Sequence, residues 1–326
     1  MRRSMAITVV SLLLLGTLTA PAAASGVRAD DGARVVASTA IGARTLDLTI
    51  ESPALARTGK VRLLLPPDWS RRPHQRWPVL YLLHGCCDTY DSWTRETDVA
   101  ALTSRTNVLV VMPEAGEVGM YSNWWNHGAG GPPAWETFHL REVRQIVERG
   151  YRAGTQRAIA GLSMGGIGAF GYPARNPGMF RAAASYSGLV HTRKDAAGLM
   201  DLVRQFGEDP LAVWGDPVRQ RRIWAAHNPY DLAARLRGIP LYLSCGTGQP
   251  GPLDQPGTDP DGVEEFIHAE NQEFTDRARR LGLRLDADLY GPGTHTWPYW
   301  ERSLHRSFPM LMRAIGARGS ERQPAA

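Results

Sequence analysis

Hydrophobic residues along the chain fall into short runs that alternate with longer segments of helical period. The segments 77–85 and 107–116 are almost continuously apolar and end at glycine. A strand that is buried on both faces of a parallel sheet has this pattern, because all of its side chains meet a hydrophobic layer. Shorter apolar runs predict further strands at 44–52, 60–69, 156–163, 181–190, 239–248 and 283–291.

Apolar residues at helical spacing occupy the segments between these runs. They predict helices at 135–151, 164–177, 262–282 and 297–316, and an irregular region of helix and loop at 192–236. The alternation of strand and helix predicts an α/β fold with a mostly parallel central sheet and helices on both of its faces.

A segment rich in glycine, proline and aspartate, residues 246–262, interrupts this alternation. It could be a linker between two domains or a long active-site loop. Because strands and helices of the same pattern continue beyond it, we favour the loop. We expect a single catalytic domain over residues 26–319 and a disordered tail at 320–326.

The first 25 residues carry two arginines, an apolar stretch and small residues in an Ala-x-Ala arrangement. This pattern predicts a signal peptide over residues 1–25, and therefore a protein that is secreted or held in the cell envelope. The alternative is a membrane anchor, but the apolar stretch is shorter than the ~20 residues that a spanning helix needs.

The composition is that of a globular protein with a large core, since 43% of the 326 residues are hydrophobic and 21% are charged. The net charge of +5 comes from 37 basic residues, nearly all of them arginine. These arginines are scattered over positions typical of solvated helix faces, so we expect no nucleic-acid partner. A basic surface could favour peripheral association with an anionic cell envelope.

The chain has three cysteines, Cys86, Cys87 and Cys245. Export would allow disulfides, but three cysteines cannot form a disulfide framework, so stability must come from packing. A bond between the adjacent Cys86 and Cys87 would be strained, and their pairing stays open.

The most informative motif is Gly161-Leu162-Ser163-Met164-Gly165, which matches G-x-S-x-G between a predicted strand and a predicted helix. In this context the serine is a nucleophile on a sharp strand-to-helix turn. Glycine is needed at the flanking positions because side chains there would collide with neighbouring backbone. The serine is then held in a strained, exposed position at a helix N-terminus, where developing negative charge is favoured.

Two cofactor motifs are excluded. A phosphate loop would need G-K-[ST], which the glycine-rich turn lacks. A calcium loop around Gly262 would need carboxylates at positions that Gly257 and His268 occupy. We therefore expect neither a cofactor nor a bound metal.

A serine hydroxyl is a weak nucleophile, so it needs a base within hydrogen-bond reach and a carboxylate that orients the base. The order along α/β-hydrolase chains is serine, acid, histidine. His295 lies in a glycine-containing loop between a predicted strand and a predicted helix, where the edge of the sheet would carry a base. The sequence pattern does not distinguish which carboxylate orients the base. The candidates are Asp254, Asp259, Asp261, Glu264 and Glu265.

Two backbone N–H groups are expected to stabilise an oxyanion at this site. One belongs to Met164, the residue after the serine. The second is expected from the loop that follows the strand at 77–85, where Gly85 allows close approach and Cys86 supplies the N–H group. His84 is expected to be structural.

In these residues the chain resembles the esterase D superfamily of α/β-hydrolases, and more narrowly the secreted antigen 85 mycolyltransferases. The resemblance runs from about residue 45 to 315. Its motifs, in order, are "GLSMGG" preceded by "MPEAGEVGMYSNWWN" and "WETF", and followed by "DPVRQRRIWAAHNPYDL", "SCGTG", "EEFIHAENQEF" and "THTWPYW". The resemblance implies an α/β-hydrolase fold.

The resemblance also implies site residues. It places the nucleophile at Ser163, the base at His295 and the acid at Glu264, which precedes Asn271 by seven positions as in the family. Asp254 is the runner-up for the acid.

Three tryptophans are candidates for substrate contacts. Trp297, two residues after the histidine, matches an aromatic residue that lines the acceptor pocket in such enzymes. Trp93 and Trp124 are further candidates.

One segment departs from the mycolyltransferases, which have Asp-Gly-Leu-Arg where this chain has His84-Gly85-Cys86-Cys87. This segment lacks the arginine that helps to bind trehalose and is more similar to general esterases.

The resemblance implies a serine acyltransferase or esterase that forms an acyl-enzyme on Ser163. Such an enzyme moves an acyl group from an ester or glycolipid donor to a sugar, a glycerolipid or water. The alternatives are a simple carboxylesterase of short or medium acyl esters and a non-catalytic envelope-binding protein of the same fold.

Overall fold

A computed structural model of the chain describes residues 26–320. The predicted signal peptide and all but the first residue of the predicted tail lie outside the described residues. At the centre is a nine-stranded sheet with the order β1-β2-β3-β5-β4-β6-β7-β8-β9. The strands are β1 (Arg34–Ala40), β2 (Thr45–Ser52), β3 (Arg57–Leu64), β4 (Trp77–Leu83), β5 (Leu109–Pro113), β6 (Ala153–Leu162), β7 (Ala182–Tyr186), β8 (Leu241–Cys245) and β9 (Leu285–Leu289).

The sheet is mostly parallel, as predicted. The pairs from β5 through β4, β6, β7 and β8 to β9 are all parallel, whereas β1, β2, β3 and β5 pair antiparallel. The sequence did not predict β1. Val35 is its only buried residue, because this strand lies at the edge of the sheet and needs no apolar run.

The four long helices were predicted close to their observed bounds, although the predicted helix at 135–151 is divided into α3, a π-helical segment η3 and α4. The region 192–236 contains four short helices and a 3₁₀ turn, η4. The helices are α1 (Ser92–Glu96), α2 (Val99–Leu102), α3 (Trp135–Thr137), η3 (Phe138–Val143), α4 (Arg144–Gly150), α5 (Met164–Arg175), α6 (Ala196–Gln205), α7 (Pro210–Trp214), α8 (Arg221–His227), α9 (Pro229–Leu232), η4 (Ala233–Leu236), α10 (Gly262–Arg280) and α11 (Trp297–Ala314).

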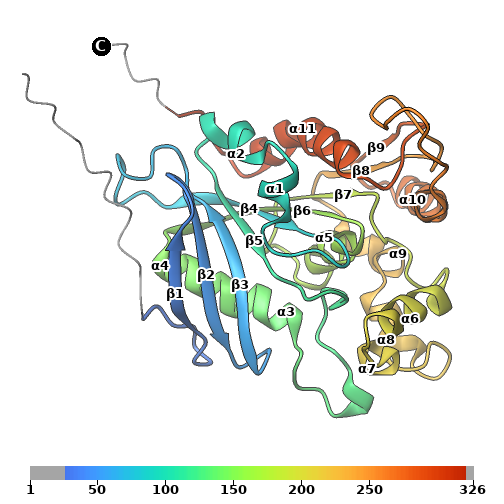
Figure 1. Cartoon of the computed structure of the whole chain (residues 1–326). Coiled ribbons are helices and arrows are strands. Elements are labelled where there is room, and N and C mark those ends of the chain that lie inside the picture. The colour runs from blue at the N-terminus through green and yellow to red at the C-terminus, as the bar shows by residue number, and fades with distance from the viewer. Residues whose placement is uncertain (1–25, 321–326) are drawn as a thin grey trace, which may run out of the picture.

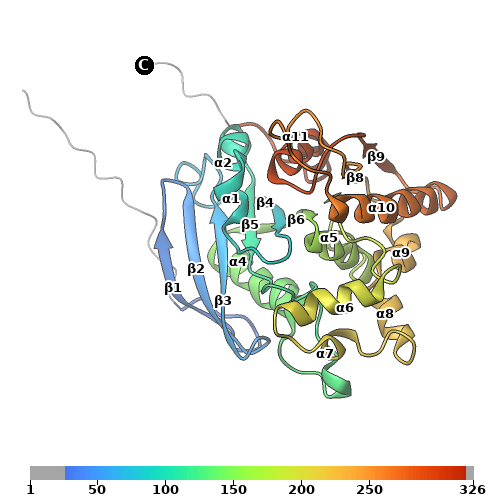
Figure 2. The same cartoon turned by 45° about the vertical axis from the view of Figure 1, so that its right-hand side comes forward.

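The residues of β4 explain why the central strands are continuously apolar. Val79, Tyr81 and Leu83 point into one hydrophobic layer, which includes residues of α4, α5 and α10. Leu80 and Leu82 point into a second layer with residues of α1, α2 and α11. Figures 1 and 2 show these two groups of helices on opposite faces of the sheet. Both faces of β4 are therefore covered, as predicted for a strand without polar alternation.

The loops at one edge of the sheet carry the predicted site residues. Ser163 follows β6, and Gly85 and Cys86 follow β4. The segment 246–262 joins β8 to α10, and His295 lies between β9 and α11. Because β4, β6, β8 and β9 are parallel, their carboxyl ends lie at the same edge, which is where ligands bind in open α/β sheets.

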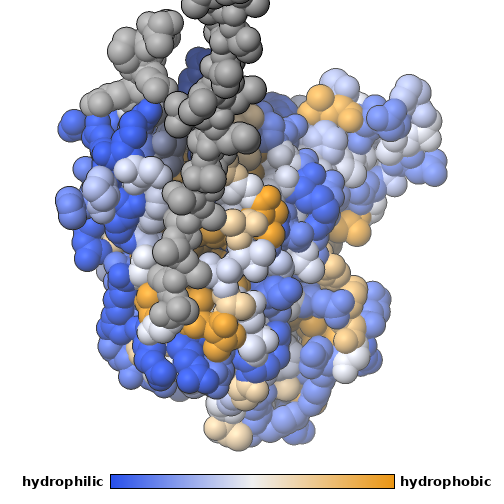
Figure 3. Space-filling view, turned by 60° about the vertical axis from the view of Figure 1, so that its left-hand side comes forward, coloured by the Kyte–Doolittle hydropathy of each residue, from blue (hydrophilic) through white to orange (hydrophobic). Residues whose placement is uncertain are grey.

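The face on the side of β1 is mostly hydrophilic, with a smaller group of hydrophobic residues near its middle (Figure 3). Val36 in β1 and Ile41 just after it are among the large hydrophobic side chains that are exposed. Within residues 26–320, no helix combines the length and the apolar character that a membrane span requires.

Candidate active site

Ser163 occupies the turn between β6 and α5 in a strained conformation. Its φ is 51° and its ψ is −122°, so it lies in the left-handed region that residues with a side chain rarely adopt. Its backbone is held there by three hydrogen bonds, because its N–H donates to Tyr186 O at 3.0 Å and its carbonyl accepts from Gly166 N at 2.9 Å and Leu189 N at 3.0 Å. A residue whose strained backbone is held in place by several hydrogen bonds is typical of a functional site.

The glycines around Ser163 are there for steric reasons. A Cβ atom at Gly161 would lie 2.3 Å from the carbonyl oxygen of Gly165, and one at Gly165 would lie 2.6 Å from that of Leu83. Both obstacles are backbone atoms, which cannot move aside as a flexible side chain could. The predicted reason for the glycines, collision with neighbouring backbone, is what the structure shows.

His295 and Glu264 form a close pair. The imidazole Nδ1 lies 2.7 Å from Glu264 Oε2, and Glu264 is 0% exposed. A carboxylate only accepts hydrogen bonds, so the imidazole donates from Nδ1, and in the neutral ring Nε2 carries the lone pair. The ring also packs edge-to-face against Trp300, with 4.9 Å between centroids. The tautomer and the orientation of the ring are thus determined by its neighbours.

The other oxygen of Glu264, Oε1, is surrounded by donors. It accepts from Ser187 Oγ at 2.7 Å, from the Gly246 N–H at 2.7 Å and from Cys245 Sγ at 3.2 Å. Burial, followed by the nearby Glu264 carboxylate, raises the pKa of the Cys245 thiol well above its usual value, so the thiol stays protonated and can donate. The buried carboxylate is therefore hydrogen-bonded through both oxygens.

Two of the other carboxylates considered for the acid have different contacts. Asp254 accepts hydrogen bonds from Thr294 Oγ1, Tyr299 OH and the Gly251 N–H, and so ties its loop to the start of α11. Burial works against the charged form of Asp254, but the hydrogen bonds outweigh it and hold the pKa below its usual value. The side chain of Asp254 is not paired with the ring of His295.

Asp261 has a role that sequence reasoning missed. Its Oδ1 accepts from the N–H groups of Val263 and Glu264 at 2.9 and 3.1 Å and caps the N-terminus of α10, while its Oδ2 accepts from the His295 N–H at 2.8 Å. One side chain therefore connects the helix that carries Glu264 to the loop that carries His295. The signal in the sequence was aspartate followed three residues later by glutamate, which is typical of a helix start.

A cavity of about 730 Å³ opens beside these groups. Gly85, Cys86, Ser163, His295 and Trp297 line it, together with residues of α6 and of the first turns of α10. Met164 follows Ser163 with its side chain fully buried. In the described part of the chain, the N–H groups of Met164 and Cys86 have no hydrogen-bond acceptor. Of these two residues, Cys86 lines the cavity, whereas Met164 follows Ser163 without lining it.

The three tryptophans expected to contact substrate are in different environments. Trp297 lines the cavity. Trp93 is buried behind it, edge-to-face with a centroid distance of 5.4 Å, and is not on the cavity wall. Trp124 is also absent from the wall, because it is buried in the layer on the far side of the sheet from Trp93, with its Nε1 donating to Gly119 O at 3.2 Å. These two aromatic side chains form core, a role that sequence cannot distinguish from a pocket wall.

His84 connects two loops of the core. Its Nδ1 bonds to Gly85 O at 2.8 Å and its Nε2 accepts from the Ala115 N–H at 3.0 Å, which requires a neutral ring. Burial lowers the pKa of His84 and favours the same neutral form.

The structure also pairs two of the three cysteines. Cys86 and Cys87 are joined as a disulfide, while Cys245 is free and buried.

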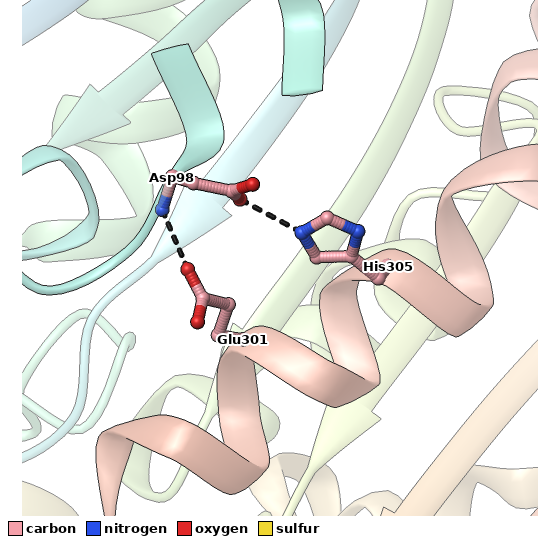
Figure 4. Close-up of side chains that lie close together, drawn as sticks. All are labelled: Asp98, Glu301 and His305. Carbon is pink, nitrogen blue, oxygen red and sulfur yellow. Dashed lines mark hydrogen bonds and ion pairs between the residues drawn. The ribbon is translucent and has the colours of Figure 1, made fainter. Parts of the chain in front are cut away.

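A group of metal-ligand types lies on another part of the surface. Asp98, Glu301 and His305 bring one ligand atom each to within 4.8 Å of one another. Figure 4 shows that they already bind each other: the Asp98 N–H donates to Glu301 at 2.7 Å, and His305 Nε2 lies 2.8 Å from the Asp98 carboxylate. These contacts join the start of α2 to α11, and none of the three residues lines the cavity.

The sequence profile of the Esterase family matches residues 52–311 of the chain. The chain belongs to this family. Esterase Rv1288 of Mycobacterium tuberculosis is 31% identical over 258 residues, which make up 76% of this chain and 54% of that protein. This member of the Esterase family therefore spans about half the length of that relative.

The Diacylglycerol acyltransferase/mycolyltransferase Ag85B of Mycobacterium leprae is 28% identical over 287 residues, covering 83% of this chain and 84% of that one. The crystal structure of Mycobacterium tuberculosis MPT51 superposes with a TM-score of 0.68 at 24% identity, covering 81% of this chain and 96% of that one. The predicted resemblance and the α/β-hydrolase fold of this Esterase family member are both confirmed.

Proposed function

We propose that the protein is a serine esterase or acyltransferase in which Ser163, His295 and Glu264 form a catalytic triad. The observation that carries this proposal is the contact of the buried Glu264 with His295, which lines the same cavity as the strained Ser163. The pairing leaves the lone pair of His295 Nε2 available as a base. Membership of the Esterase family supports the same chemistry.

The reaction would proceed through an acyl-enzyme. His295 Nε2 takes the proton of Ser163 Oγ as this oxygen bonds to the ester carbonyl carbon, and the carbonyl π electrons move onto its oxygen. The C–O bond to the leaving alcohol then breaks, and His295 gives its proton to that alcohol. Water or a second alcohol repeats the two steps in reverse and frees the acyl group and Ser163.

The oxyanion would be stabilised by the N–H groups of Met164 and Cys86. Both follow the carboxyl ends of neighbouring parallel strands, β6 and β4. A Cβ at Gly85 would lie 3.1 Å from the Cβ of Ser163, so the loop that carries Cys86 reaches the nucleophile closely. The fixed backbone donors would need no reorganisation as charge develops on the oxygen.

An alcohol acceptor, a sugar or a glycerolipid, is the form of the reaction that the likeness to the mycolyltransferase favours. The segment from His84 to Cys87 favours water instead, because it lacks the arginine found in the mycolyltransferases. Either reaction takes an acyl ester or glycolipid as substrate. We also propose that the protein is exported through the segment 1–25 and acts in the medium or the cell envelope.

The decisive experiment is labelling of the mature protein with a fluorophosphonate, with the adduct located by mass spectrometry. We expect the label on Ser163, and loss of labelling together with a ~10⁴-fold or larger loss of p-nitrophenyl ester turnover in Ser163→Ala. An unlabelled Ser163, or a Ser163→Ala variant that still turns over the ester, would instead favour a binding protein. Incubating acyl donors with and without sugar acceptors, and identifying the products, separates transfer from hydrolysis.

A further inference from the structure

Glu270 is a buried carboxylate that the proposed mechanism does not use. It lies in the wall of the same cavity as Ser163 and His295, and it is 1% exposed. Buried carboxylates are rare unless they are paired. The contacts of Glu270 therefore require an explanation.

The donors to Glu270 come from the protein backbone on one side. Its Oε2 accepts from the His191 N–H at 3.1 Å, and the N–H of Val190 also approaches the carboxylate. No side chain in residues 26–320 donates a hydrogen bond to it. A carboxylate has about four acceptor positions, so residues 26–320 do not fill all of the positions of this residue of the cavity wall.

The cationic side chains nearby are held elsewhere. Lys194 forms an ion pair with Glu273, one turn further along α10, and Arg193 pairs with Asp231 at 2.8 Å. His191 stacks on Tyr230, with 3.9 Å between ring centroids. Burial raises the pKa of Glu270 to about 7, because it outweighs the backbone N–H groups and the charge of Lys194, which lower this pKa.

The position of Glu270 along α10 relates it to the reacting groups. Glu264 and Glu270 both belong to the buried face of α10 and are six residues apart, which is a rise of about 9 Å. Phe266 and Ile267 from α10 and Leu199 and Leu202 from α6 contribute an apolar part of the cavity wall, which also includes the polar Thr192, Asp195 and Gln205. A substrate whose ester lies at Ser163 would therefore run along an apolar surface before it reaches Glu270.

We propose that Glu270 determines substrate specificity by accepting a hydrogen bond from a neutral hydroxyl group that lies across an apolar segment from the scissile ester. This inference rests on the proposed esterase function, because it assumes that the ester binds at Ser163. A hydroxyl fits better than an ammonium group, because Arg193 and Lys194 flank the same loop and an apolar wall would strip the cation of water. The hydroxyl could belong to the acyl part or to the alcohol part of the ester.

Two matched pairs of esters test the proposal. Methyl 3-phenylpropanoate and methyl 3-(4-hydroxyphenyl)propanoate differ by one hydroxyl at the far end of the acyl part. The acetates of 2-phenylethanol and of 2-(4-hydroxyphenyl)ethanol differ by the same hydroxyl on the alcohol part. We expect kcat/KM for the hydroxylated member of one pair to be at least about tenfold higher than for the other member. Without the hydroxyl, the buried carboxylate of Glu270 would lack this hydrogen-bond partner. The pair that shows the preference identifies the part of the ester that enters the cavity.

Variants connect the preference to Glu270. In Glu270→Leu the ratio of kcat/KM within the responding pair should fall to about one, and in Glu270→Gln, which keeps an acceptor oxygen, part of the ratio should remain. Glu273→Gln is the matched control, since Glu273 is on the same helix and outside the cavity wall, and it should leave the ratio unchanged. If Glu270 only supported the loop at 190–191, Glu270→Leu would lower both members equally and the proposal would be overturned.

The failure of this proposal can be distinguished from failure of the esterase function. Fluorophosphonate labelling of Ser163 with no hydroxyl preference in either pair overturns the specificity role alone. Without labelling or turnover, calorimetry of 3-phenylpropanoate and 3-(4-hydroxyphenyl)propanoate on the wild-type protein takes the place of kinetics. Equal affinities there overturn the role of Glu270, and a preference for the hydroxylated acid that Glu270→Gln weakens supports it.

Discussion

Glu264 and Glu270 lie on the same buried face of one helix and differ in what surrounds them. Glu264 is bonded through both oxygens, to His295 on one side and to Ser187, Cys245 and Gly246 on the other. Glu270 has backbone N–H donors on one side and the cavity on the other. The comparison teaches that the partners of a buried carboxylate, rather than its burial, indicate its role: a saturated one orients a neighbour, and an unsaturated one is available to a ligand.

Substitution of Glu264 is expected to have the largest effect on activity. In Glu264→Gln the amide would donate to His295 or leave its Nδ1–H unpaired, so the imidazole would lose its orientation and tautomer. We expect kcat/KM for a p-nitrophenyl ester to fall about 10³–10⁴-fold. Glu265→Gln, an exposed neighbour on the same helix, should retain full activity. Activity within tenfold of wild type in Glu264→Gln would remove Glu264 from the triad.

The second prediction concerns Glu270 and pH. Because its folded-state pKa of about 7 lies above the ordinary glutamate pKa of 4.5, the folded protein keeps a proton that the unfolded chain releases. The stability from this site is complete below the lower value and is lost as the pH rises through about 7, by at most about 3 kcal/mol. Glu270→Gln should therefore gain stability relative to wild type as the pH rises from 4.5 to 8, measured by urea unfolding at several pH values. A difference that does not vary with pH would contradict the raised pKa.

A smaller effect is expected at Asp261, which supports the orientation of His295 from outside the reacting groups. Asp261→Ala removes the cap of α10, at a cost of about 1 kcal/mol in unfolding free energy. It also removes the acceptor for the His295 N–H, so kcat should fall about tenfold with little change in KM. Asp259→Ala, at an exposed position two residues earlier, is the control. Unchanged kcat in Asp261→Ala would limit Asp261 to capping.

The smallest effect is expected at Ser187. Ser187→Ala deletes one of three donors to Glu264 Oε1, which should cost about 1 kcal/mol of stability and lower kcat only a few-fold. Ser185→Ala is a matched control in the same strand region, because the buried Ser185 hydroxyl has no hydrogen-bond partner within residues 26–320. Thermal unfolding of both variants tests the difference. Equal destabilisation would mean that the hydrogen bond of Ser187 contributes little.

Much of this fold and part of the site could be predicted from local sequence. The strands β4 and β5 were recognisable because both of their faces are buried, and the turn at Ser163 because only glycine fits around it. Edge strand β1 was missed, since exposure leaves it no apolar pattern. Trp93 and Trp124 illustrate the opposite error, because an aromatic side chain has the same sequence signature in a core as on a pocket wall.

The sequence by itself determined the alternation of strands and helices, the serine turn and the loop that carries His295, because these depend on steric and hydrophobic patterns within a few residues. The tertiary structure decided which carboxylate meets the imidazole, that Asp261 joins α10 to the His295 loop, and that Glu270 belongs to the cavity wall. Five carboxylates near one loop are equivalent in sequence. They differ only once α10 is packed against the sheet, because hydrogen bonds and burial depend on atoms that lie far apart along the chain.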